Sequence, residues 1–516
     1  MIRTACAVAT LLLVCGCGIT GFEESNRLSP EEIKSLIDKA PYPNLTATSE
    51  AKLPGRTVTK PDGTRSATIN LAEAIQLALA NNQGFLSSTE GLDLQLLSLE
   101  ATRRSWWPLL SSDLSGSVGW ADSKGGSGSS SESVGLGLSQ KLPWGASASL
   151  SAATSGSQGV GPNSYSSSAS AGISVPILRG GGWRLGIEGT VAAERGYVYA
   201  RRTYAYNKVK LYVDTVESYF RQLQQEDLIR NSERNLERAK MGLRQSDLLY
   251  RLARTSQTDV LRAKLQVTLA EDALTNAREQ LRIAREAFKL DLGLRPEDEL
   301  ILEGEKLEHH PIAVNPEEAI AAVFQSNPFW LNAKDAFDDA GRGLEFAENA
   351  TLPSLNIGAG YSWSFEPTTR PFENFQLSSE GYSASASFSY ALDRRDTNRT
   401  YQAAVIGYRA AERGFRRTRD QFARDTQSLI SAVKQAEVNM ENQRRAIKDA
   451  ERSVLLNTYE YRRGRIKNRD VIEAQDQLLA AQNGYQDKLV SAKISQFRLL
   501  QWIGRLEVDD EGRWFK

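Results

Sequence analysis

The sequence predicts a mixed α+β membrane protein that is internally duplicated, with long α-helical coiled-coil hairpins and strands that cross a bilayer. The first observation is a repeat: Tyr250–Gln266 (YRLARTSQTDVLRAKLQ) matches Tyr461–Gln477 (YRRGRIKNRDVIEAQDQ) at a constant offset of 211 positions. The second is that both halves contain runs in which apolar residues alternate with serines. The third is that proline-free stretches such as 183–252 carry apolar residues at every seventh position. Because internal repeats reveal the building unit of a chain, each element is expected twice.

A second pair of matching segments shows that the duplication covers most of the chain. Asn70–Asn82 (NLAEAIQLALANN) lies over Asn315–Asn327 (NPEEAIAAVFQSN) at an offset of 245. The first copy must therefore hold 34 more residues between these anchors and the tips, and most of them fall in the Gly/Ser-rich region 122–164. The predicted segments are a signal peptide at 1–16, a tether at 17–69, a first repeat at 70–300, a linker at 301–314, a second repeat at 315–504 and a tail at 505–516.

The N-terminus has the layout of a secretory signal. Residues 1–16 contain one Arg and an apolar run that is too short to span a membrane in the mature chain. The end of this segment resembles a bacterial lipobox, with Cys17 as the lipidated residue. Gly18 rather than Asp follows the cysteine, and by the same resemblance this favours sorting to the outer membrane. The alternative is a signal that is cleaved elsewhere, with Cys17 incidental.

Charge and hydropathy exclude two classes of protein. Lys+Arg and Asp+Glu both number 63, so no overall charge indicates binding to nucleic acid. A mean hydropathy of -0.41 excludes a bundle of membrane-spanning helices. No run of about 20 apolar residues follows the signal. If the chain crosses a membrane, it must therefore do so as strands.

Alternating runs of the required kind occur at about 109–176 in the first repeat and at about 354–391 in the second. Each run has roughly the 9 to 11 residues that a tilted strand needs to cross a bilayer, with one apolar face and one serine face. A soluble β-sandwich could alternate in the same way, but it would pack its apolar faces together, whereas long helices separate these pairs. A transmembrane β-barrel shared between chains is the better interpretation. Whether a weak further hairpin at 133–153 joins the barrel stays open.

Heptad repeats predict coiled-coil seams in both hairpins. Leu236 and Leu243 belong to a series of sevens in the first long helix, and Ile447 and Val454 belong to the matching series in the second. Alanines interleave with apolar residues in the returning helices, which permits close contacts between helices. The hairpin tips are predicted at about 252–258 and about 463–469.

The order of short helix, strands, long helix, tip and return helix, found twice, resembles the TolC-type outer-membrane efflux proteins. The resemblance covers about residues 70–504 and rests on Pro108 and Pro353 before the strands, PILRGGG and LDRR after them, and Asp-Val at each tip. It implies a homotrimer with a twelve-stranded barrel in the cell outer membrane and a periplasmic α-helical tunnel. It further implies a passive duct for small molecules or polypeptides, which receives its cargo from an inner-membrane pump through a periplasmic adaptor protein.

The resemblance also implies a gate at the tips. Carried over residue by residue, the carboxylates that face the tunnel axis fall on Asp470 and Glu473, and a hydrogen-bonding pair falls on Asp259 and Tyr461. From the residues alone, Asp259 and Asp470 could instead be N-caps of the returning helices. Two positions depart from the family pattern: the gate arginine falls on Ile466, and Ala253 stands where a turn glycine is usual. Docking on the adaptor would involve the tip residues Arg254, Thr255, Gly464 and Arg465.

Several local motifs are better explained by structure than by chemistry. The spacing of Gly180–Gly182 fits neither Walker A nor GxGxxG, so a bend from strand to helix is expected. His309–His310 are the two histidines of the chain, and no partner ligands suggest a metal site. No nucleophile stands with a base, so neither a cofactor nor an enzymatic activity is expected. Trp106–Trp107 could anchor the chain at a membrane interface or pack beneath the strands.

A rival hypothesis from another class is a non-conducting structural lipoprotein, a coiled-coil spacer between the outer membrane and the cell wall. Such a spacer should show one uninterrupted heptad array, so the paired strands count against it. A periplasmic adaptor is a third option, but adaptors have one hairpin and this chain has two.

Overall fold

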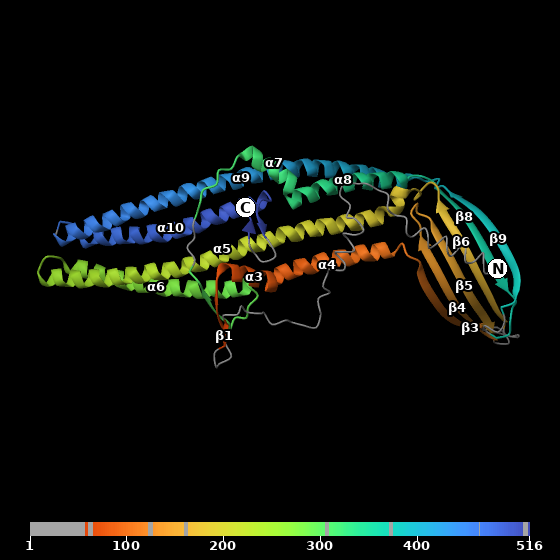
Figure 1. Cartoon of the computed structure of the whole chain (residues 1–516), viewed down its shortest axis with the longest axis horizontal. Helices are drawn as coiled ribbons and strands as arrows, with labels where there is room; N and C mark the ends of the chain where they lie inside the picture. Colours follow the sequence, from red (N-terminus) through yellow and green to blue (C-terminus); the bar gives the residue numbers. More distant parts are fainter. Residues whose placement is uncertain are drawn as a thin grey trace. The chain divides into compact units, whose positions relative to one another are not determined.

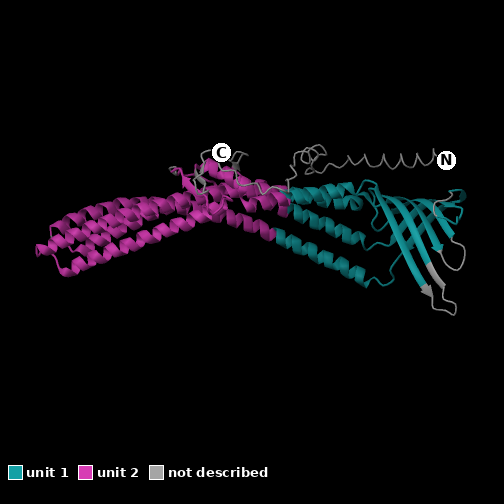
Figure 2. Cartoon of the chain, turned by 90° about the horizontal axis from the view of Figure 1, so that it is seen from below, with its two compact units in different colours: residues 1–42, 92–200, 334–415 teal, residues 43–91, 201–333, 416–516 magenta. Residues whose placement is uncertain are grey.

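A computed structural model describes residues 57–59, 65–121, 127–158, 164–304, 309–370, 375–463, 465–508 and 514–515. These residues form two compact units (Figure 2). Within the described ranges, unit 1 is drawn from 92–200 and 334–415, and unit 2 is drawn from 43–91, 201–333 and 416–516. The predicted signal peptide, Cys17 and most of the predicted tether lie outside the described residues.

Unit 1 contains one antiparallel sheet of six strands in the order β3-β4-β5-β6-β8-β9 (Figure 1). The first four strands come from the first repeat and the last two from the second, and β6 joins the repeats by pairing with β8. The weak hairpin at 133–153, which the sequence alone does not assign to the barrel, is part of this sheet as β4 and β5. The strands are β3 (Leu109–Ala121), β4 (Ser127–Lys141), β5 (Ser147–Gln158), β6 (Ser164–Pro176), β8 (Ser354–Phe365) and β9 (Leu377–Ser389).

The two faces of the sheet differ in chemistry. On one face the cross-strand neighbours are mostly apolar, for example Leu110 beside Leu138, and Leu114 on this face is 82% exposed. The other face carries mainly serines and glycines. Lipid on one side and water on the other would suit these two faces. Serine hydroxyls bond across the strands of the second face at 2.7, 2.7 and 2.8 Å in the pairs Ser115 with Ser133, Ser117 with Ser131 and Ser151 with Ser170.

The predicted glycine bend and the tryptophan pair lie where the strands of unit 1 meet its helices. Gly180 and Gly182 have φ of +78° and +112°, a conformation that favours glycine, and the Gly180 N–H donates to Asn349 Oδ1 over 2.8 Å. The segment is therefore a bend between β6 and α5. The two tryptophans take different roles, since Trp106 Nε1 donates to Thr190 Oγ1 over 2.8 Å whereas Trp107 is 71% exposed.

Each repeat supplies one helical hairpin, and both tips belong to unit 2. The helix α5 (Trp183–Arg251) turns into α6 (Gln257–Asp291), and α9 (Arg395–Arg462) turns into α10 (Asn468–Trp502). With 69 residues, α5 is about 100 Å long. The predicted seam is partly internal to the first hairpin, where Leu236, Ala239, Ala270 and Leu274 form one buried cluster.

The duplication is visible at atomic detail where each hairpin ends. In the first repeat the helices α3 (Leu71–Asn81) and α4 (Gln83–Arg104) meet at Asn82, whose Nδ2 donates to the Asp291 carbonyl over 2.7 Å. In the second repeat α7 (Pro316–Ser326) and α8 (Pro328–Asn349) meet at Asn327, whose Nδ2 donates to the Trp502 carbonyl over 3.0 Å. Each asparagine also accepts an N–H from the helix that follows it.

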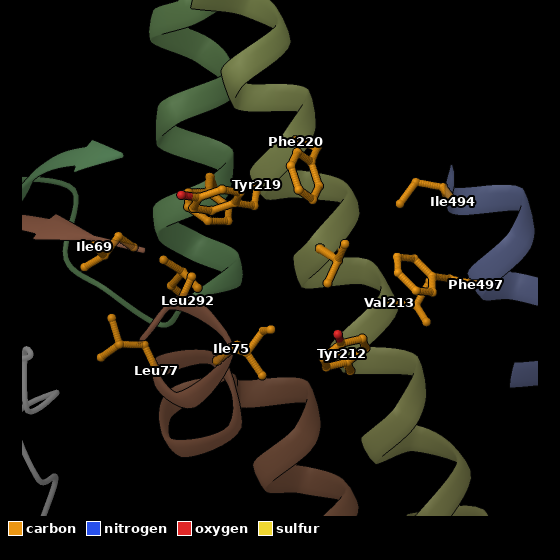
Figure 3. Close-up of a cluster of buried hydrophobic side chains, with 14 of the residues drawn as sticks. Ile69, Ile75, Leu77, Tyr212, Val213, Tyr219, Phe220, Leu292, Ile494 and Phe497 are labelled. Carbon is orange, nitrogen blue, oxygen red and sulfur yellow. The ribbon is translucent and has the colours of Figure 1, made fainter. Parts of the chain in front are cut away.

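The main core of unit 2 lies among the helices α3, α5, α6 and α10, beside a small sheet (Figure 3). The strand order of this sheet is β1-β2-β7. Its strands are β1 (Thr57–Thr59), β2 (Arg65–Ile69) and β7 (Glu299–Leu302), and β2 pairs with β7 in parallel. Ile69, Tyr212 and Phe497 are among the buried members of the core. The last residues of the predicted tether, 65–69, therefore form a strand in unit 2, and the side chain of Ile69 is buried in its core. A short pair, β10 (Glu507–Val508) and β11 (Trp514–Phe515), follows α10.

Among the helices that the structure describes, none combines the length and the apolar composition needed to cross a membrane.

Candidate functional site

The first hairpin tip ends α5 with a tight backbone turn. The Arg254 N–H donates to the Leu249 carbonyl over 2.8 Å, the six-to-one hydrogen bond of a Schellman motif. Ala253 occupies the left-handed position of this motif with φ of +57°. A residue with a Cβ costs about 1–2 kcal/mol in that conformation, so the turn carries backbone strain where glycine is usual.

The start of α6 is capped by hydroxyl and carboxylate groups. Ser256 is the N-cap, and its Oγ accepts the Asp259 N–H over 3.2 Å. In return Asp259 Oδ2 accepts hydrogen bonds from Ser256 Oγ and Thr255 Oγ1, at 2.8 and 2.9 Å. Partial burial raises the pKa of Asp259, but these hydroxyls and the nearby charge of Arg262 outweigh it, so the pKa lies below its usual value. Asp259 therefore stays ionised and stabilises the tip as part of a cap.

The second tip repeats the six-to-one hydrogen bond, but its N-cap residue, Lys467, has no hydroxyl. The Arg465 N–H donates to the Glu460 carbonyl over 3.0 Å, and the Arg465 guanidinium pairs with the Glu460 carboxylate at 3.3 Å. The Arg463 guanidinium lies 4.1 Å from the centre of the Tyr459 ring, within the range of a cation–π contact. Gly464, the predicted docking residue that matches Ala253 at the offset of 211, lies outside the described residues.

The two predicted axial carboxylates have different local surroundings. The Lys467 N–H donates to Asp470 Oδ2 over 3.1 Å. Asp470, the third residue of α10, therefore helps to cap the start of its helix, as Asp259 does for α6. Glu473 lies one turn further along the helix and is exposed. Capping thus accounts for one oxygen of Asp470 and for no part of Glu473. Both residues therefore keep carboxylate oxygens that can interact with groups outside this chain.

A buried contact of Tyr461 connects the two hairpins near their tips, but its partner is not the predicted Asp259. The Tyr461 hydroxyl lies 3.2 Å from Ser246 Oγ, and both side chains are buried. The predicted bond between Tyr461 and Asp259 is therefore not formed within one chain, because Asp259 is occupied by its own cap. The hairpins meet at Asp259 through its carbonyl, which accepts from Asn468 Nδ2 over 3.5 Å.

Further along the hairpins, α6 and α10 lie in contact with each other. Gln266 Nε2 donates to Asp476 Oδ1 over 2.9 Å, and burial raises the pKa of Asp476 despite this hydrogen bond. The sequence reasoning missed Ser246, Asn468 and Asp476. A signal was present only for Ser246, a polar residue seven positions after the buried Ala239. Six side chains on these two helices are buried: Ala263 and Ala270 of α6, and Val471, Ala474, Leu478 and Ala481 of α10.

The histidine pair forms a packing contact. His309 Nε2 lies 3.6 Å from Glu437 Oε1, and Gln496 Nε2 donates to the His310 carbonyl over 2.8 Å. Burial lowers the pKa of His309. Within the described ranges, no group of three or more His, Cys, Asp or Glu side chains is placed to hold a metal ion.

A duplicated chain with two long helical hairpins and an antiparallel sheet has the architecture of a TolC-type channel subunit. The sequence pattern of the outer membrane efflux protein family matches residues 144–294 and 320–505. The chain therefore belongs to the outer membrane efflux protein family. This family consists of outer-membrane channels of tripartite export systems, which are homotrimers with periplasmic tunnels and are not enzymes.

Solved structures of such channels share the fold. The Campylobacter jejuni CmeC outer membrane channel aligns with a TM-score of 0.64 and 13% identity, over 95% of this chain and 91% of that one. The open Neisseria gonorrhoeae MtrE channel aligns with a TM-score of 0.62 and 16% identity, over 84% of this chain and 88% of that one. The Vibrio cholerae outer membrane protein VceC aligns with a TM-score of 0.63 and 12% identity, over 84% of this chain and 96% of that one. A search of the curated proteins found no match.

Proposed function

We propose that three copies of this chain form a passive outer-membrane exit duct, anchored by lipid on Cys17. An inner-membrane pump would deliver small molecules or polypeptides to it through a periplasmic adaptor protein. The observation that carries the proposal is the six-stranded sheet with an apolar face, a hydroxyl face and two strands, β3 and β9, at its ends. Sheet ends leave backbone groups unpaired, and closure with further copies would pair them.

Exposed apolar rows on the helices support assembly of several copies. Leu261, Leu265 and Leu269 recur every four residues on α6 and are 60%, 59% and 51% exposed. Residues four apart share one face of a helix, so these leucines form an exposed apolar stripe. Contact of such a stripe with water is unfavourable. In a trimer the hairpins of neighbouring chains would cover such stripes.

Conductance separates this proposal from the spacer hypothesis. Purified protein reconstituted in planar bilayers should give discrete channel openings, and crosslinking should give a trimer. A trimer that never conducts, even when the tip residues are changed as below, would favour the structural spacer.

The axial carboxylates of the proposed gate, which also includes Asp259 and Tyr461, are Asp470 and Glu473. Three copies would place six carboxylates near one axis, and such a ring attracts cations and repels anions. The double variant Asp470→Asn with Glu473→Gln should therefore lose cation selectivity and block by multivalent cations. Glu451→Gln, which removes an exposed carboxylate further along α9, is the control and should leave selectivity unchanged. Unchanged selectivity in the double variant would assign Asp470 to helix capping alone.

The proposed docking surface consists of the tips, where Arg254 and Arg465 are exposed and Thr255 is half-buried against Asp259. Gly464 remains part of the proposal as the second-tip turn residue. Arg254→Glu with Arg465→Glu should abolish crosslinking to the adaptor and co-purification of the pump. Arg278→Glu, an exposed charge reversal distant from the tip along α6, is the matched control.

The proposed lipid anchor has a separate test. Cys17→Ala should abolish acyl labelling while the protein stays in the outer membrane, because a closed barrel resists extraction far more than acyl chains do. Release of this variant into the soluble periplasm would contradict the membrane-spanning part of the proposal.

A further inference from the structure

The first repeat carries a hairpin of strands that the second repeat lacks. In the second repeat, β8 pairs directly with β9. In the first, β3 and β6 take the corresponding places, but β4 and β5 stand between them. Residues 127–158 therefore account for nearly all of the surplus that the sequence offset reveals.

This inserted hairpin is integrated along its full length. β4 pairs with β3 from Leu109 opposite Ser139 to Ala121 opposite Ser127, and β5 pairs with β6 over a comparable length. The turn between them packs closely on the start of α5, since a Cβ at Gly186 would lie 2.6 Å from the Pro143 carbonyl oxygen. This contact ties the turn of the hairpin to α5, and the pairing on both sides holds its strands in the sheet.

The insertion also preserves the direction and the faces of the sheet. Two added strands leave β3 antiparallel to β6, as it would be without them. Across the insertion the apolar face continues through Leu110, Leu138, Leu150 and Ala171. The opposite face continues as serine and glycine. The sheet therefore gains width without a break in either face.

The hydroxyl face carries little charge. Asp113 and Lys141 are its charged side chains among the described residues of the six strands. Glu132 and Glu380 lie on the apolar face, and each accepts a hydrogen bond from a tyrosine there, Tyr165 and Tyr361 respectively. Water on the serine face would therefore meet small neutral groups.

We propose that the inserted hairpin widens the membrane pore, an inference that rests on the trimeric channel proposed above. Six strands from each of three copies close eighteen strands, where the family resemblance implies twelve. With strands about 4.8 Å apart and tilted by about 40°, the backbone diameter rises from about 24 Å to about 36 Å. Such a pore admits hydrophilic cargo that is too wide for a twelve-stranded barrel. Because its hydroxyl face carries little charge, it discriminates only weakly between cargoes of different charge.

The direct test is the deletion of residues 127–158, which leaves β3 and β6 as a hairpin joined by the segments before and after the insertion. Parent and deletion trimers in lipid nanodiscs are imaged by electron microscopy and averaged along the three-fold axis. The parent barrel should be about 1.5 times as wide as the deletion barrel. A parent barrel with the width of twelve strands overturns the inference, whereas a parent that forms no trimer overturns the proposed function itself.

A second measurement does not depend on the deletion variant folding. The pairs S115C/S133C and S151C/S170C join the insertion to its neighbours on either side, and oxidation in outer-membrane preparations should link each pair within one chain. The pair S115C/S155C is the control, because both residues lie opposite Ser133 on different strands and are about 10 Å apart. Failure of both test pairs to link while the protein is membrane-inserted would place the hairpin outside the barrel.

Discussion

The two repeats use the same groups at the joint, the place where each return helix ends against the two short helices of its repeat. Asn82 and Asn327 donate to carbonyls at the ends of the return helices. Gly293 and Gly504, which follow those helices, adopt φ of +66° and +68°. At the tips they differ, since Ser256 caps α6 with a hydroxyl while Lys467 precedes α10. The strands differ as well, four against two. The two repeats thus keep the same structure at the joints. They differ at the tips and in the sheet, the two regions to which the proposed function is assigned.

The largest expected effect concerns the two joint glycines. A Cβ at Gly293 would lie 2.3 Å from the Asn81 backbone oxygen, whereas at Gly504 the nearest atom, at 2.5 Å, is the side-chain Oγ of Ser326. Backbone cannot move aside as a side chain can. Gly293→Ala should therefore cost about 3 kcal/mol and Gly504→Ala about 2 kcal/mol. Thermal unfolding followed by circular dichroism measures both, and equal losses would mean that both joints relax alike.

The asparagines should rank in the opposite order. Asn327 is 0% exposed, whereas Asn82 is half-buried, so removal of Asn327 leaves the Trp502 carbonyl without water to replace the bond. Asn327→Ala should cost about 2–3 kcal/mol and Asn82→Ala about 1 kcal/mol. The same unfolding measurement applies. A larger loss for Asn82 would show that the first joint carries more of the stability.

A smaller effect is expected from exchanging the caps. Ser256→Ala should destabilise the first tip by about 1 kcal/mol, and Lys467→Ser should stabilise the second by a similar amount. Amide hydrogen exchange in the first turns of α6 and α10 reports both changes locally. If Lys467→Ser leaves exchange unaltered, Asp470 already supplies the second cap in full.

The smallest effect concerns the strained turn. Ala253→Gly should stabilise the first tip by up to about 1 kcal/mol, because glycine adopts the left-handed conformation without the Cβ clash. The flexibility that glycine adds to the unfolded chain limits the gain. Slower hydrogen exchange at residues 249–256 is the expected readout, and faster exchange would show that Ala253 is not strained.

The sequence was sufficient for the repeat, the long helices and the tips, because their signals depend on spacing within one segment. It was insufficient for Ser246 with Tyr461 and for Asn468 with Asp259, since these contacts depend on how one hairpin is rotated against the other. Family resemblance predicts Asp259 as the partner of Tyr461, whereas in this chain Asp259 accepts hydrogen bonds from the hydroxyls of Thr255 and Ser256. The sequence does not assign the β4–β5 hairpin to the sheet, because its serines and glycines give only a weak alternation.

The composition of the strands also bears on how the protein reaches its membrane. β5 (SASLSAATSGSQ) contains one β-branched residue, Thr154, and serine and glycine have little intrinsic tendency to form strands. In water such segments gain little by pairing with one another and are poor seeds for aggregates. During export they should remain soluble and unpaired. The bilayer, which forces every backbone group to find a partner, would then be the solvent that completes their folding.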